Sequence, residues 1–134
     1  MNKTIFLDTN VILRYLLKDK PEQFEKIEET FSLLKTGKMS GYILSEVLLE
    51  AYYILISFYK APKKETLISL KGLLLYKGLV GKEKELLLNA INYVLDDSGV
   101  SLLDWVLCLK ARQGNGRILT FNKKLERDCN KLTK

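Results

Sequence analysis

Short apolar runs alternate along the chain with longer stretches whose apolar residues recur at helical spacing. The apolar runs predict strands at residues 3–7, 39–44, 78–81 and 117–120. Spacings of three and four predict helices directly after residue 8, over residues 21–36, 46–59, 63–76, 82–96 and 101–114, and beyond residue 122. This alternation indicates an α/β fold in three layers (α/β/α), with a short central parallel sheet between helices. The helix pair within residues 46–76 is additional to that pattern, and we expect a single domain over residues 1–134.

Several predicted helices carry recognisable start and stop residues. Pro21 fits the first turn of a helix, and Gly37 fits the end of that helix. Ser45, Ser101 and Asn122 are expected caps, because their side-chain oxygens can accept hydrogen bonds from free backbone N–H groups. For the two helices of the additional pair, the expected core residues are Val47, Leu48, Ala51, Leu55, Phe58, Leu67, Leu70, Leu73 and Leu74.

The chain contains no histidine, which excludes several kinds of active site. A Ser-His-Asp triad, a Cys-His pair and histidine-based acid–base cleavage of RNA all need an imidazole. Any hydrolysis must therefore rest on carboxylates, lysine or a metal ion. The remaining composition, 47% hydrophobic and 28% charged, is ordinary for a soluble globular protein.

The lengths of the apolar runs, the N-terminal residues and the spacing of the cysteines together favour a cytoplasmic protein. No apolar run approaches the roughly 18 residues that a membrane helix needs. Asp8, Asn10 and Arg14 interrupt the N-terminal stretch that would have to be apolar in a signal peptide. Cys108 and Cys129 form no CxxC pair, so we expect both to be reduced, with Cys108 buried in the core.

The net charge of +6 comes entirely from the last part of the chain. Residues 1–109 carry 14 basic and 14 acidic side chains, whereas residues 110–134 carry eight basic side chains against two acidic ones. Such a basic segment suits a polyanion, although charge alone favours a solvated helix face. Lys123, Lys124 and Arg127, just beyond Asn122, are the candidates for a rim that binds the phosphates of a polyanion.

Four polar positions fall where predicted helices begin beside predicted strands. They are Asp8, either Glu46 or Glu50, Asp104 and Asn122. In open α/β sheets, ligands bind at the carboxyl ends of the strands, so these side chains could meet in one site. Each of them could also be only a helix cap, which leaves the two readings balanced for any single residue.

Asp104 is the hardest of these residues to explain as a cap. It lies within Leu102–Leu109, a stretch that is apolar nearly all round and is therefore expected to be buried. A buried carboxylate is costly without a partner, and a metal ion is one such partner. Mg²⁺ and Mn²⁺ take oxygen ligands and need few carboxylates, and they would supply a nucleophile without histidine.

These residues carry a resemblance to a known family. Residues 5–10 (IFLDTN) look like the opening of PIN-domain proteins, and residues 47–60 (VLLEAYYILISFYK) resemble their glutamate helix. Residues 100–105 (VSLLDW) and 118–125 (ILTFNKKL) resemble the segments that carry the third and fourth acids of the family. The blocks keep the family's order over nearly the whole chain, and the length and helix pair look most like VapC-type toxins of toxin–antitoxin pairs.

The resemblance implies a Mg²⁺- or Mn²⁺-dependent endoribonuclease, usually a homodimer, that is silenced by a cognate antitoxin protein. By position, Asp8, Glu50 and Asp104 would hold the metal. Thr9, Asn10 and Thr120 would support them, and Asn122 would stand where many members have aspartate. Glu46 remains the alternative to Glu50, because the two share one face of the same helix.

Three other functions can be compared with the same residues. A phosphatase with an aspartate nucleophile needs a second acid two residues after the first, but that position is Asn10. A phospho-receiver domain needs an acidic pair before its phosphorylated aspartate, and no acidic pair precedes a predicted strand here. The serious alternative is a catalytically weak or inactive PIN-like domain that binds RNA or protein, a reading that Asn122 allows.

Overall fold

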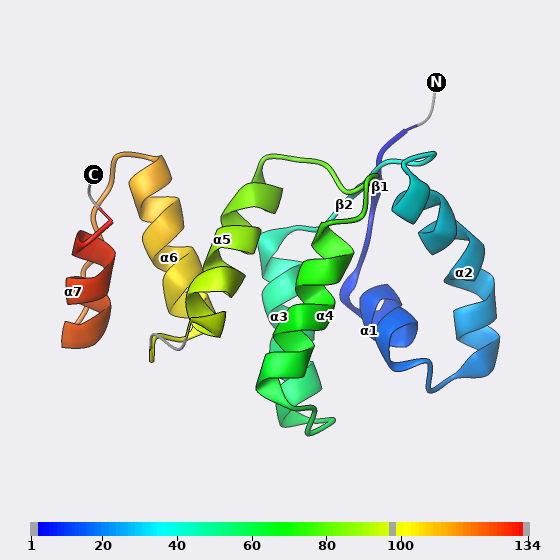
Figure 1. Ribbon diagram of the computed structural model, residues 1–134, viewed down its shortest axis with the longest axis horizontal. Coiled ribbons are helices and arrows are strands. Elements are labelled where there is room, and N and C mark those ends of the chain that lie inside the picture. The colour runs from blue at the N-terminus through cyan, green and yellow to red at the C-terminus, as the bar shows by residue number, and fades with distance from the viewer. Residues whose placement is uncertain (1–2, 97–98, 133–134) are drawn as a thin grey trace. The chain divides into compact units, whose positions relative to one another are not determined.

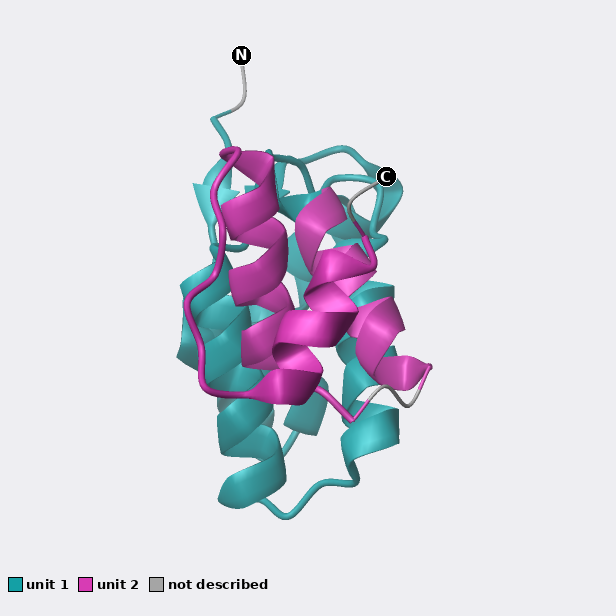
Figure 2. Cartoon of the chain, turned by 90° about the vertical axis from the view of Figure 1, so that its left-hand side faces the viewer, with its two compact units in different colours: residues 1–84 teal, residues 85–134 magenta. Residues whose placement is uncertain are grey.

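The computed structural model describes residues 3–96 and 99–132 of the chain. In this part, the elements follow the order β1 (Ile5–Phe6), α1 (Thr9–Leu17), α2 (Pro21–Thr36), β2 (Gly41–Tyr42), α3 (Ser45–Ser57), α4 (Lys63–Leu74), α5 (Glu83–Leu95), α6 (Leu102–Gln113) and α7 (Lys123–Asn130) (Figure 1). The predicted helices are all present, and their ends agree closely with the sequence pattern. The chain divides into two compact units, residues 1–84 (unit 1) and 85–134 (unit 2) (Figure 2).

Unit 1 contains a small parallel sheet. Strand β1 pairs with β2, with Ile5 opposite Gly41 and Phe6 opposite Tyr42. The predicted strand at 78–81 is reduced to one parallel bridge, between Leu79 and Gly41. An α/β fold is therefore confirmed for this unit, with shorter strands than predicted, whereas three layers and a single domain stay predictions.

Gly78 shows why the chain can pass so close to the sheet at this bridge. A Cβ atom there would lie 2.0 Å from the carbonyl oxygen of Met39 and 2.7 Å from that of Leu34. The N–H of Gly78 donates to the Leu34 carbonyl (2.7 Å), and the Gly41 N–H donates to the Gly78 carbonyl (2.8 Å). Only glycine fits this approach of backbone to backbone, so Gly78 fixes the third segment beside β2.

The predicted strand at residues 117–120 is wrong. These residues form an irregular connection between α6 and α7, and both Leu119 and Phe121 are fully exposed. A strand needs a backbone partner for its N–H and C=O groups, and the described part of unit 2 contains no other strand. The apolar run predicted a strand, but the run by itself supplies no partner.

The helices of unit 1 bury one continuous apolar core. Helix α1 packs against α2 and α3, and α3 packs against α4. The leucines predicted to face inward on α4 (Leu67, Leu70, Leu73 and Leu74) are all buried. On α3, Leu48, Ala51 and Leu55 are buried as predicted and Val47 is half-buried.

Phe58 is not a core residue, contrary to the prediction. It is 74% exposed because α3 ends at Ser57, which leaves Phe58 at the cap, with its ring edge-on to that of Tyr59. Tyr52 takes an inward position instead and is only 3% exposed. Burial raises the pKa of the Tyr52 hydroxyl above its ordinary value.

Aromatic packing joins α1 to α2 and to the turn after α4. The ring of Tyr15 stacks on that of Phe31, with centroids 3.8 Å apart, and lies 6.0 Å from that of Phe24. The hydroxyls of Tyr15 and Tyr76 are hydrogen-bonded at 2.6 Å. Burial, together with this bond, raises the pKa of Tyr15. These contacts hold α1 in place, and α1 begins directly after Asp8.

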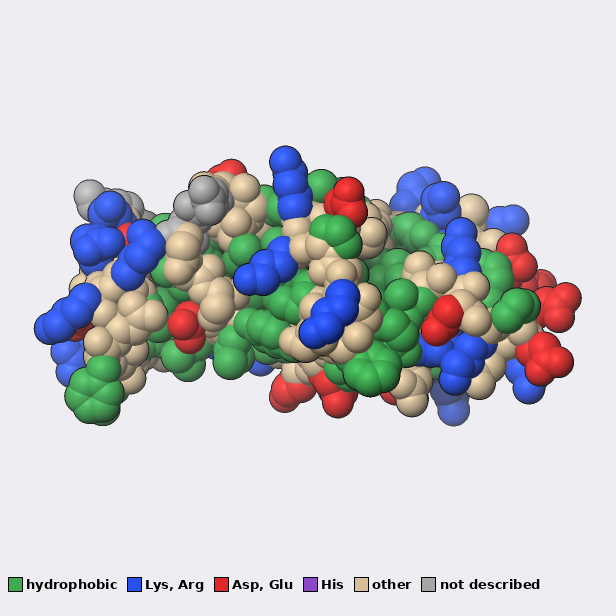
Figure 3. Space-filling model, turned by 90° about the horizontal axis from the view of Figure 1, so that it is seen from below, with side chains coloured by type: hydrophobic (Ala, Val, Ile, Leu, Met, Phe, Trp, Pro, Cys, Tyr) green, Lys and Arg blue, Asp and Glu red, His purple; other side chains and the backbone are tan. Residues whose placement is uncertain are grey.

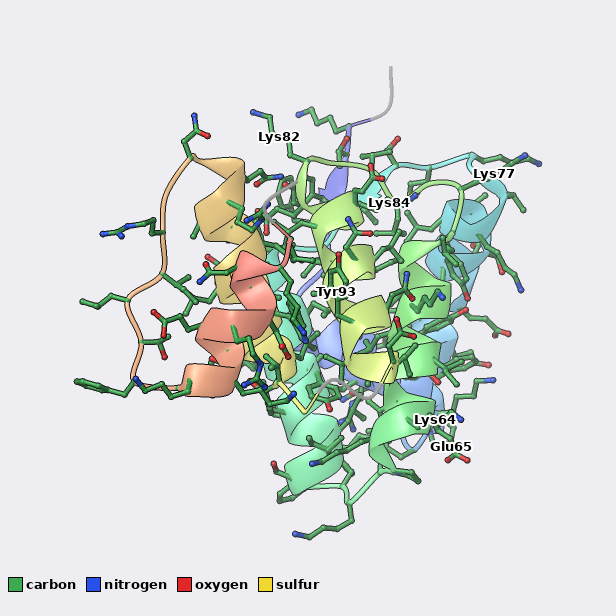
Figure 4. All side chains as sticks on the ribbon, turned by 60° about the vertical axis from the view of Figure 1, so that its left-hand side comes forward. Lys64, Glu65, Lys77, Lys82, Lys84 and Tyr93 are labelled. Atoms are coloured by element: carbon green, nitrogen blue, oxygen red, sulfur yellow. A yellow bond between two sulfur atoms is a disulfide. The ribbon has the colours of Figure 1, made fainter. Side chains whose placement is uncertain are left out.

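Unit 2 is held together by a ring stack and a disulfide. Tyr93 of α5 (labelled in Figure 4) stacks on Trp105 of α6, with centroids 4.5 Å apart. Cys108 of α6 is bonded to Cys129 of α7, with Cα atoms 6.0 Å apart. The expectation of reduced cysteines is therefore wrong for this structure, because the two helices bring the sulfurs within bonding distance. The expected burial of Cys108 is confirmed.

Candidate active site

Asp8 lies at the carboxyl end of β1 and caps α1. Its Oδ1 accepts a hydrogen bond from the backbone N–H of Val11 at 2.9 Å. The predicted strand-to-helix turn is therefore present, and the carboxylate is exposed to solvent. Capping uses Oδ1 and does not use Oδ2, so Asp8 could cap the helix and bind a ligand at the same time.

Thr9 connects the start of α1 to the glutamate of α3. Its hydroxyl donates to Oε1 of Glu50 at 2.5 Å, across 41 residues of sequence. Thr9 follows Asp8 directly, so this contact brings the carboxylates of Asp8 and Glu50 to the same end of unit 1. Glu46 makes a different contact, with the hydroxyl of its neighbour Ser45 at 3.2 Å.

The start of α3 is capped by Glu83, a residue that sequence reasoning missed. The N-cap position is Leu44, so the prediction that Ser45 caps this helix is wrong. The backbone N–H of Ser45 donates instead to Oε1 of Glu83 at 2.7 Å, and the Tyr42 hydroxyl contacts Oε2 at 3.4 Å. A carboxylate from 38 residues away has taken the place of a local hydroxyl, and no local pattern could have indicated it.

Lys84, the next residue, anchors the same region to the bridge beside β2. Its Nζ donates to the carbonyl oxygen of Leu79 at 2.8 Å (Lys84 is labelled in Figure 4). Glu83 and Lys84, at the beginning of α5, therefore bind the first residue of α3 and the segment that bridges to β2. These contacts help to hold α3, the helix that carries Glu50, in place.

Arg14 is a buried cation on α1 that the sequence analysis did not select. Its guanidinium donates to Asp19 at 3.1 Å and to the hydroxyl of Tyr59 at 2.9 Å. The bond to Tyr59 and the charge of Asp19 raise the pKa of Arg14 despite its burial. One signal was available: Arg14 interrupts an otherwise apolar run, and a charged residue there must have partners.

In unit 2, Asp104 lies in the first turn of α6. The side chain of Ser101 caps the helix and accepts from the backbone N–H of Asp104 at 3.1 Å, so the predicted cap is confirmed. The premise that α6 is buried all round is wrong, because Leu103 is 51% and Leu107 is 47% exposed. Asp104 itself is half-buried. Burial alone therefore does not demand a metal partner for this carboxylate.

Asn122 caps α7, as predicted. Its Oδ1 accepts from the backbone N–H of Leu125 at 3.1 Å, and its own N–H donates to the Thr120 hydroxyl at 3.0 Å. Thr120 thus holds Asn122 in place. The neutral oxygen available to a ligand at Asn122 already has a hydrogen bond in this structure.

The predicted basic rim lies on α7. Lys123, Lys124 and Arg127 are all exposed, and Figure 3 shows Lys and Arg side chains gathered over the part of unit 2 that contains this helix. Asp128 offsets part of the charge, at 3.4 Å from Lys124 and 3.7 Å from Arg127. Lys123 contributes a cation outside these two ion pairs.

Comparison with known proteins identifies the family. The model of the PIN domain matches residues 4–91, which is more than half of the chain. The chain belongs to the PIN domain family. The match includes Asp8, Thr9, Glu46 and Glu50 and ends before Asp104 and Asn122. No curated protein and no solved structure matched the chain.

PIN domains are generally nucleases and generally use divalent metal ions. The chemistry of the donors in unit 1 of this PIN domain fits Mg²⁺ or Mn²⁺, because Asp8, Thr9 and Glu50 offer only oxygen ligands. Within residues 3–96 and 99–132, no group of three or more acidic, cysteine or histidine residues is arranged to hold a metal ion. Two carboxylates still suffice for Mg²⁺ when waters and substrate phosphates complete the coordination.

A pocket of about 230 Å³ lies between α1 and α2 of the PIN domain, beside Asp8. Its lining residues are Asp8, Asn10, Val11, Arg14, Gln23, Lys26 and Ile27. Asn10, predicted to support the acids, therefore lines this pocket rather than contacting Glu50.

Within the described residues, no helix is both long and apolar enough to cross a membrane.

Proposed function

We propose that this PIN domain protein is a Mg²⁺- or Mn²⁺-dependent endoribonuclease. The observation that carries the proposal is the hydrogen bond of Thr9 to Glu50 beside Asp8, which supports a common metal site for two carboxylates. The absence of histidine is consistent with the same chemistry, because hydrolysis then has to rely on carboxylates, lysine or a metal ion.

In this proposal, Asp8 and Glu50 hold the metal ion. A metal ion held there would supply polarisation of a phosphoryl oxygen of the RNA and a lower pKa of a bound water molecule. Thr9 orients the Glu50 carboxylate, and the cap of α1 orients that of Asp8. On the family resemblance alone, Asp104 is the proposed third metal ligand and Asn122 a proposed neutral catalytic residue.

The experiment is RNA cleavage by purified protein, free of any inhibitor, in Mg²⁺, in Mn²⁺ and in EDTA. We expect a structured RNA pool to be cut with either metal and to stay intact in EDTA. Undiminished cutting in EDTA would exclude the metal mechanism. RNA binding without cutting in Mn²⁺ would instead favour the alternative function, a catalytically weak or inactive domain that binds RNA or protein.

Glu50→Gln should lower cleavage by at least on the order of 10–100-fold, the range found when residues that only support a metal ligand are changed. Glu46→Gln should keep full activity, because Glu46 lies in the first turn of α3 and contacts Ser45 rather than Thr9. Removing the Glu50 charge should leave the melting temperature without metal unchanged or higher, yet abolish stabilisation by Mn²⁺. The reverse pattern, a dead Glu46→Gln and an active Glu50→Gln, would move the second ligand by one helical turn.

Changing Lys123, Lys124 and Arg127 together to alanine tests the rim on α7. If these cations bind RNA phosphates, each lost contact should flatten the dependence of log affinity on log salt by about 0.7. The measurement is RNA affinity between low and high salt for the wild type and the triple variant. Lys63, Lys64 and Lys71 of α4, changed in the same way, provide the control. Equal slopes for the rim variant and the wild type would leave the rim as a solvated helix face.

The wider role that we propose is the toxin of a toxin–antitoxin pair, active in the cytoplasm as a homodimer and silenced by a cognate antitoxin protein. The proposal rests on the resemblance of the helix pair to that of VapC-type toxins. Exposed aromatic surface near the helix pair gives the antitoxin a place to bind. Phe58 is exposed and Tyr53 and Tyr59 are half-exposed, whereas Tyr52 is buried.

A further inference from the structure

The pocket between α1 and α2 has a composition that suits one chemical class of ligand. Val11 and Ile27 are half-buried and give it a predominantly apolar surface. Gln23 and Asn10 are exposed and add side-chain amides, each with two donors and one acceptor. An apolar wall bordered by amide groups matches a planar ring with polar groups along its edge.

Charge argues against a phosphate as the occupant. Arg14 lines the pocket, but Asp19 forms an ion pair with it at 3.1 Å and Tyr59 takes a second of its donors. Lys26 is the remaining cation of the lining, and Asp8 contributes an opposing negative charge. The pocket therefore offers an anion little net attraction.

The volume of the pocket and its position beside Asp8 limit further which ligands could occupy it. At about 230 Å³ the pocket is smaller than the roughly 300–1,000 Å³ of clefts that bury a whole small molecule. Asp8 belongs both to this lining and to the proposed metal site. An occupant of the pocket would therefore lie beside Asp8, next to the proposed metal site.

We infer that this pocket receives one unstacked RNA base next to the cleaved phosphate, and that Gln23 reads the edge of that base. Single-stranded RNA is recognised in this way, by bases that leave the stack and meet apolar surfaces and polar groups. Lys26, at the exposed border, would accompany the backbone of the same nucleotide. This inference rests on the proposed ribonuclease function, to which it adds a specificity-determining site.

The test uses a pool of single-stranded RNAs with randomised bases, sequenced after partial cutting in Mn²⁺. We expect the wild type to favour one base beside the cut by about fivefold or more, the discrimination that hydrogen-bonded readout of a base supplies. Gln23→Ala, which removes the amide, and Ile27→Trp, which fills the pocket, should lower cutting at the favoured sequence to the level of the others. The matched controls are Gln113→Ala and Ile68→Trp, the same changes at exposed positions outside the pocket, which should keep the preference. A wild type without base preference, or a preference unchanged in both pocket variants, would overturn the inference.

A second measurement separates this inference from the proposed function. Nucleoside 5′-monophosphates are titrated onto the labelled protein while NMR follows the Ile27 methyl and Gln23 amide signals, with ribose 5-phosphate as the probe that lacks a base. Shifts with the nucleotides alone support a base site even if no RNA is cut, in which case only the proposed function fails. Equal shifts with ribose 5-phosphate would mean a phosphate site and would overturn the inference, as would no shift with any of these compounds.

Discussion

Asp8→Asn is expected to lower RNA cleavage at least about 100-fold, the upper end of the range for changes around a metal ligand. Asparagine keeps the side-chain oxygen that caps α1 through the N–H of Val11, and it is as good a cap as aspartate. The substitution removes the negative charge that a divalent cation needs and replaces Oδ2, the oxygen not used in the cap, with an NH2 group that cannot bind a metal. Loss of activity with a folded protein would therefore report on the metal and not on the helix.

The measurement combines turnover in Mn²⁺ with the melting temperature of the metal-free protein. We expect the melting temperature to change little, since lost attraction to the helix dipole, about 0.3–1 kcal/mol, is opposed by relief of repulsion from Glu50. Asp96→Asn, at an exposed aspartate outside the proposed site, is the matched control and should cut like the wild type. If the protein is a toxin, Asp8→Asn should also remove the growth arrest that expression of the wild type causes. Wild-type turnover by Asp8→Asn would remove Asp8 from the site.

The same substitution at Asp104 tests the acid of unit 2 independently. Ser101, not Asp104, supplies the cap of α6, so Asp104→Asn leaves that hydrogen bond in place. A comparable loss of cleavage would support Asp104 as the third ligand. Full activity would leave the metal with Asp8 and Glu50 alone, which Mg²⁺ chemistry allows.

The sequence predicted those parts of the fold that local interactions determine. Helix periodicity located α1 to α7, and Gly37, Ser101 and Asn122 marked helix ends because their effects act within one turn. The same local logic placed Asp8 at the end of a strand and at the start of a helix. Each of these predictions needed no knowledge of what lies across the fold.

Predictions failed where the answer depends on distant residues. The cap of α3 comes from Glu83 rather than from Ser45, and the apolar run at residues 117–120 lacks a strand to pair with. Phe58 has the spacing of a core residue, but α3 ends one residue before it. Cys108 and Cys129, 21 residues apart, gave no spacing signal for the bond that joins them.

In the candidate site, too, local features could be predicted from the sequence and contacts between distant residues could not. Sequence left Glu46 and Glu50 as alternatives, because both lie on one face of α3. In the structure Glu50 accepts a hydrogen bond from Thr9, 41 residues away, whereas Glu46 contacts its neighbour Ser45, and helical spacing could not show this difference. The pocket beside Asp8 could not be predicted from the sequence either. Its lining comes from α1 and α2, and the packing of these helices depends on the stacking of Tyr15 on Phe31.

Removing the disulfide between α6 and α7 is expected to lower the free energy of unfolding by about 3 kcal/mol, the loop-entropy value for cysteines 21 residues apart. The bond restricts the unfolded chain, so its loss stabilises the unfolded state. Both cysteines are buried, Cys108 completely, so a reductant should reduce the bond only slowly in the folded protein. The wild type should therefore be compared with and without reductant after unfolding and refolding under each condition.

The measurement is denaturant unfolding followed by a signal from Trp105, which packs on Tyr93 in the same unit. Cys108→Ala with Cys129→Ala should unfold at the same denaturant concentration with and without reductant, and this double variant is the control for effects of the reductant elsewhere. Its stability should be at or below that of the reduced wild type, because alanine also removes two buried sulfur atoms from the core. A wild type whose unfolding midpoint does not respond to reductant would show that the bond between α6 and α7 does not form in solution.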